Sequence, residues 1–106
     1  MKRFGIKLTD KKRYKFDFAP LENDTGDSNW LDRTSSPAEQ LSSYAFTQDS
    51  PTGISIISSA LEDSNTSVGL TVQATAVGRW KVSCQATTTN SPSQITTETM
   101  LFVVSD

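Results

Sequence analysis

The second half of the chain alternates apolar and polar positions with the two-residue period of β-strands. The clearest case is residues 80–86, where Trp80, Val82, Cys84 and Ala86 would face one side and polar residues the other. Turn sequences rich in Asp, Asn, Ser, Pro and Gly separate further predicted strands around residues 41–46, 54–58, 68–74 and 95–104. In the last of these both faces become apolar, so the alternation does not assign its inward face.

A sixth strand is predicted near the N-terminus, over residues 13–18. Tyr14, Phe16 and Phe18 point one way there, and Pro20 ends the pattern because proline cannot donate to a strand ladder. Six short strands with turns every ~8–12 residues, and no segment with helical periodicity, are typical of a small antiparallel sandwich. We therefore predict an all-β fold.

Composition narrows the available chemistry. Ser and Thr make up 29 of the 106 residues, His is absent and Cys84 is the single cysteine. Without His the chain lacks the commonest general base and metal ligand, and one cysteine can form neither an internal disulfide nor a zinc site alone. No Ser-x-x-Lys motif offers a lysine base to a serine nucleophile. We expect no enzymatic activity, no cofactor and no metal.

Charge is distributed unevenly along the chain. Seven of the ten basic residues lie in the first fifteen positions, opposed there by Asp10 alone, so this stretch carries +6 and the remainder −8. We interpret residues 1–11 as a basic extension that is solvated or ordered by a partner. The acidic body argues against nucleic-acid binding as the main role. No apolar run approaches the ~18 residues of a membrane span, so we expect no membrane partner.

These features divide the chain into an extended N-terminal arm with a docking segment (residues 1–36) and a β-sandwich (residues 37–106). Four apolar residues of the first part, Phe16, Phe18, Trp30 and Leu31, either anchor the arm in a partner or complete the core of the chain itself. In the second part, Trp80, Val82 and Cys84 are expected to be core anchors.

Three stretches carry a resemblance to a known family. They are Lys-Phe-Asp-Phe-Ala-Pro-Leu at residues 15–21, Gly-Asp-Ser-Asn-Trp-Leu at 26–31 and Gly-Arg-Trp-Lys-Val-Ser-Cys at 78–84. Together they resemble small virion proteins of tailed bacteriophages described as fibre–tail adaptors. The resemblance implies an immunoglobulin-like antiparallel β-sandwich preceded by an extended segment.

The resemblance also implies a function in assembly. The protein would be a structural component of the virion, made in the cytoplasm of the host bacterium, that links tail fibres to the tail in several copies through contacts with other tail proteins. Capsid decoration on the phage head is the alternative within assembly. A carbohydrate-binding module for host attachment is a third reading, for which Trp30 alone offers an aromatic platform.

Overall fold

The described residues form seven β-strands. The computed structural model describes residues 2–18, 31, 38–49, 52–90 and 92–106, and no helix occurs among them. The strands are β1 (Lys2–Lys7), β2 (Lys11–Asp17), β3 (Leu41–Gln48), β4 (Ile54–Glu62), β5 (Ser67–Ala74), β6 (Gly78–Thr88) and β7 (Ile95–Ser105).

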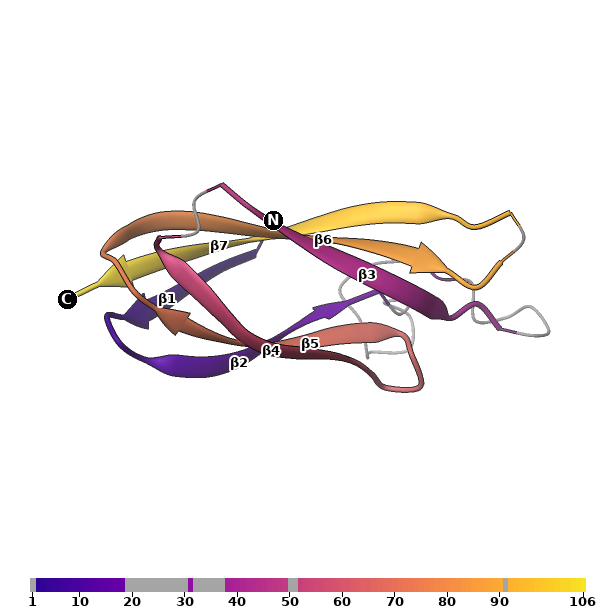
Figure 1. The fold of residues 1–106 in the computed structure, drawn as a ribbon, viewed down its shortest axis with the longest axis horizontal. Helices are drawn as coiled ribbons and strands as arrows, with labels where there is room; N and C mark the ends of the chain where they lie inside the picture. Colours follow the sequence, from indigo (N-terminus) through magenta and orange to yellow (C-terminus); the bar gives the residue numbers. More distant parts are fainter. Residues whose placement is uncertain (1, 19–30, 32–37, 50–51, 91) are drawn as a thin grey trace.

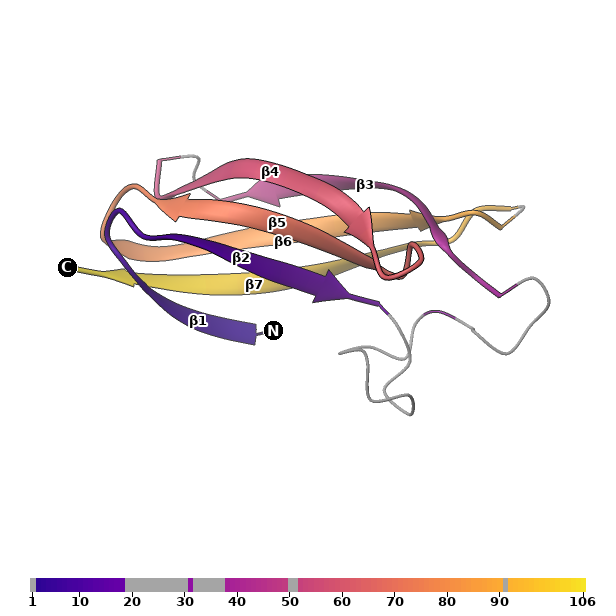
Figure 2. The same ribbon diagram turned by 90° about the horizontal axis from the view of Figure 1, so that it is seen from below.

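Two sheets stack face to face (Figure 1). One has the order β1-β7-β6-β3 and the other the order β2-β5-β4. Every pair is antiparallel except β1 with β7, which is parallel. Figure 2 shows β1 and β2 along one long edge of the molecule and β3 and β4 along the other. The predicted all-β sandwich is confirmed, and this strand arrangement is compatible with an immunoglobulin-like fold.

The core lies between the sheets and is built from alternating positions of the strands. The last strand, whose inward face the pattern left open, directs Met100, Phe102 and Val104 into this core. Near the β1–β2 edge Phe4, Tyr14 and Phe102 form an aromatic cluster. The Tyr14 ring centroid lies 4.7 Å from that of Phe4 and 4.9 Å from that of Phe102. These rings join β1, β2 and β7 across the two layers.

The N-terminal residues differ from the expected arm. Residues 2–7 form β1, paired with β7, and residues 11–17 form β2, paired with β5, so both stretches are strands of the sandwich. The predicted division into an arm (residues 1–36) and a sandwich (residues 37–106) is therefore wrong for residues 2–18 and 31, which belong to the sandwich. The physical reason is that Ile6 and Tyr14 bury their side chains, which are 5% and 8% exposed, while the cations between them point into solvent and keep their hydration.

The connection between β4 and β5 ties the two sheets together at one end. Asp63, Ser64 and Asn65 all have positive φ, between 54° and 62°, a region in which Asn and Asp are favoured among non-glycine residues. The carbonyl of Asn65 accepts a hydrogen bond from the Leu41 amide (2.7 Å), where β3 begins. The Thr66 carbonyl accepts one from the amide of Phe18 (3.1 Å), just after β2.

Candidate interaction surfaces

Three of the four expected docking residues lie in the core of the chain itself. Phe16, Phe18 and Leu31 are 3%, 0% and 1% exposed and belong to the main hydrophobic cluster. The Leu31 amide also donates to the Phe18 carbonyl (3.3 Å). These three residues therefore complete the core of the chain itself, and their assignment as docking residues is wrong. Trp30 lies outside the described residues.

The three core anchors lie on the inward face of β6, as expected from their spacing. Val82 and Cys84 are fully buried, and Trp80 is half-buried against the cluster. The Trp80 ring covers the backbone of Gly53, just before β4, at the position a Cβ atom would occupy there. Its indole Nε1 donates to the Ala76 carbonyl (2.9 Å), between β5 and β6. Trp80 therefore closes one end of the sandwich.

Cys84 has no accessible thiol chemistry in this fold. Burial raises the pKa of its thiol to about 12, so the thiolate, which is the reactive form, is strongly disfavoured.

A basic edge runs along the side of the molecule formed by β1 and β2. We define it by the seven cations Lys2, Arg3, Lys7, Lys11, Lys12, Arg13 and Lys15, all of which are exposed. Two are neutralised across the three-stranded sheet, where Arg13 pairs with Glu62 and Lys15 Nζ lies 2.6 Å from Asp63 Oδ2. The hydrogen bonds from Lys15 and then from Ser67 lower the pKa of Asp63. Most of the edge remains positive.

The opposite edge is almost free of charge. β3 contains no charged residue, and β4 contains only Glu62, at its last position. Both strands carry irregularities in their pairing, between Leu41 and Ser43 in β3 and between Ile56 and Ser58 in β4. Such bulges discourage uncontrolled pairing of an exposed edge with other chains. The hydroxyl of Tyr44 lies 2.8 Å from Ser59 Oγ and links the two strands.

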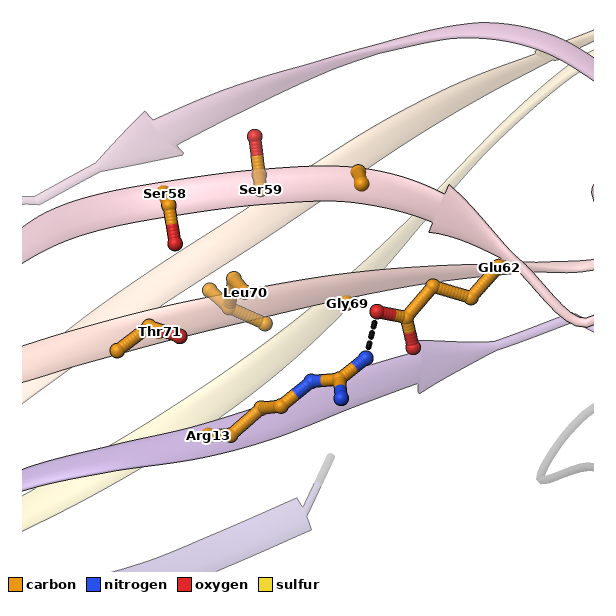
Figure 3. Close-up of a pocket in the computed structure, with 8 residues that line it drawn as sticks. Arg13, Ser58, Ser59, Glu62, Gly69, Leu70 and Thr71 are labelled. Atoms are coloured by element: carbon orange, nitrogen blue, oxygen red, sulfur yellow. Dashed lines mark ion pairs between the residues drawn. The ribbon is translucent and has the colours of Figure 1, made fainter.

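A shallow groove of about 420 Å³ crosses the outer face of the three-stranded sheet. Figure 3 shows Arg13 from β2 reaching over Gly69 of β5 to Glu62 of β4, with Ser58 and Thr71 on the same side. The ion pair occupies one end of the groove, and the floor is made of small side chains. The described lining supplies hydroxyls but no unpaired carboxylate to activate them, because Glu62 forms an ion pair with Arg13.

Across the described parts of the chain, no group of three or more metal-ligating side chains comes together. The described residues also contain no helix that is long and apolar enough to cross a bilayer. No family model matches the chain, and no curated protein and no solved structure matches it either.

The strand register brings together a second group of cations, which was not predicted from the sequence. On the outer face of the four-stranded sheet, Leu101 of β7 lies between Arg3 of β1 and Lys81 of β6. In the next row Val103 lies between Gly5 and Arg79. The sequence signal was partial: alternation places basic residues 79 and 81 on the outward side of their strand, but it did not assign Leu101 and Val103 to an outward face.

Proposed function

We propose that this chain is a structural protein of a bacteriophage virion, an adaptor that links tail fibres to the tail through protein–protein contacts. The immunoglobulin-like character of the sandwich belongs to the same proposal. Its basis in the sequence is the resemblance of residues 15–21, 26–31 and 78–84 to fibre–tail adaptors.

The observation that carries the proposal is the chemical difference between the two long edges of the sandwich. An adaptor has to hold two different partners at fixed positions. The cations that β1 contributes to the basic edge suit an acidic partner, whereas the β3–β4 edge, whose one charged residue is Glu62, suits a partner that packs through uncharged side chains. Because the same core supports both edges, their separation is fixed by the fold.

Capsid decoration is the alternative within the same class, since a small sandwich with a charged edge can also attach to a head lattice. A carbohydrate-binding module has less support from the described residues, because their aromatic side chains pack against the core cluster and do not form an exposed platform.

Quantitative mass spectrometry of the purified parent particle tests the proposal. About a dozen copies per particle, a small multiple of a tail symmetry, is the expected result for a tail adaptor. Hundreds of copies would instead identify head decoration, and absence from the particle would overturn both assignments.

A further inference from the structure

The outer face of the four-stranded sheet has an apolar centre where a two-layer sandwich normally presents polar residues to water. Leu101 is 6% exposed, yet it is not part of the core cluster between the sheets. Its neighbours in the register are Arg3 and Lys81, whose aliphatic stems are placed to cover it while their charged ends remain in solvent. Val103, in the next row, is half-buried.

Four exposed cations surround this centre: Arg3 and Lys7 from β1, and Arg79 and Lys81 from β6. We call this set, together with Leu101 and Val103, the β7 platform. Within the part of the chain that the structure describes, none of the four cations has an ion-pair partner. The nearby carboxylates are engaged by backbone amides: Asp49 Oδ1 accepts from Lys81 N (2.9 Å) and Asp10 Oδ2 from Lys7 N (3.3 Å).

The middle of the platform is open. A Cβ atom added at Gly5 would have no neighbouring heavy atom within 4 Å, so the surface between Arg3 and Lys7 is low. A partner side chain can therefore approach the backbone of β1 there and reach Val103 beside it. The platform combines a shallow apolar floor with a rim of unneutralised positive charge, which is the pattern of a protein interface with a polar rim.

We propose that the β7 platform binds an acidic protein surface in which carboxylate side chains flank an apolar residue. The inference deepens the proposed assembly function and rests on it, because it names the chemistry of one of the two partners. Charge complementarity favours this occupant: carboxylates can pair with the four exposed cations, and an apolar side chain can pack on half-buried Val103.

A single-stranded nucleic acid fits the same charges less well. Proteins that bind it without sequence preference stack bases on exposed aromatic side chains. No described aromatic residue lies on this face; Phe4, Trp80 and Phe102 belong to β1, β6 and β7 but pack with the core. The apolar floor here consists of aliphatic side chains instead.

The probe for the test is a short fluorescein-labelled peptide with the sequence Glu-Ser-Val-Ser-Glu, which in an extended conformation presents two carboxylates and the apolar side chain between them on one face. Its binding to the full chain is followed by fluorescence anisotropy at low salt. The variant R79E/K81E reverses two platform charges that lie far in sequence from the N-terminal cations. Its matched control is K11E/K12E, which changes the net charge equally but alters exposed residues of β2 in the other sheet. Circular dichroism confirms that both variants remain folded.

We expect R79E/K81E to weaken peptide binding about tenfold or more, and K11E/K12E to weaken it no more than about threefold. V103T, which keeps the shape of the side chain but removes an apolar group, should also weaken binding. Equal losses in the two charge variants would overturn the proposal, because binding would then follow net charge alone. Failure of wild type to bind the peptide would also overturn it.

Two further probes identify a wrong occupant. Tighter binding of an oligothymidylate of equal charge, or of phosphatidylserine vesicles, would assign the platform to a nucleic acid or a lipid surface and overturn the acidic-protein assignment. The binding assay needs no virus particle, so its failure is distinguishable from failure of the virion proposal, which copy counting tests separately.

Discussion

Replacing Gly53 by Ala should destabilise the protein, because the added methyl group has no space in the fold. The new Cβ would occupy the space of the Trp80 ring atoms Cγ, Cδ2 and Cε2, so the indole has to move. Overpacking of this kind costs about 1–3 kcal/mol. Loss of the hydrogen bond from Nε1 to the Ala76 carbonyl adds about 0.5–1.5 kcal/mol.

The two terms together predict a loss of about 1.5–4.5 kcal/mol in the free energy of unfolding, measured by urea denaturation with far-UV circular dichroism. The melting temperature should fall by roughly 6 °C or more. Gly5→Ala is the matched control. It adds the same methyl group to an open site with ordinary φ, and we expect it to be neutral or to stabilise by up to about 1 kcal/mol.

A double-mutant cycle isolates the contact between the two residues. In a Trp80→Ala background the ring is gone, so Gly53→Ala should cost almost nothing. Two results would refute the reasoning: Gly53→Ala as stable as Gly5→Ala, or an equal cost of Gly53→Ala with and without Trp80. Either would mean that Trp80 does not pack on the Gly53 backbone.

Four further predictions rest on burial, charge and strand order. The Cys84 thiol should resist Ellman's reagent at pH 8 in the folded protein and react only after unfolding; rapid native labelling would contradict its burial. The lowered pKa of Asp63 contributes stability above its unfolded pKa of about 3.9, which is lost as pH falls through the folded value. Wild type should therefore exceed Asp63→Asn in stability at pH 6, and the difference should shrink progressively as the pH falls below about 3.9; a constant gap would exclude this titration. Phe18→Ala should lower the free energy of unfolding by about 3–5 kcal/mol, measured by chemical denaturation. Deletion of residues 1–18 should abolish cooperative unfolding, because β1 and β2 are then missing. A folded deletion product would restore the separate-arm interpretation.

Much of the fold could be predicted because β6, one of the two longest strands, alternates cleanly. In β6 every second residue from Trp80 to Ala86 packs toward the core, so pattern alone identified the strand and its inward face. β1 was missed because its two inward apolar residues, Phe4 and Ile6, are set among cations and a glycine. Those cations favoured the interpretation of this segment as a solvated or partner-ordered extension.

The candidate surfaces were harder to predict for a different reason. Alternation shows that Phe16 and Phe18 share a buried face, but it cannot show whether their own chain or a partner covers that face. The β7 platform depends on the register of three strands, two of them from opposite ends of the chain. Local sequence carries no information about the row that joins Arg3, Leu101 and Lys81.

The parallel pairing of β1 with β7 has a mechanical consequence. A force that pulls the start of β1 and the end of β7 in opposite directions acts along both strands, so it shears their ladder instead of unzipping it. All six registered pairs, from Lys2–Met100 to Lys7–Ser105, then share the load at once. An unzipped hairpin would break its pairs one after another. Tension applied through these two strands would therefore meet the resistance of the whole ladder before the sandwich opens.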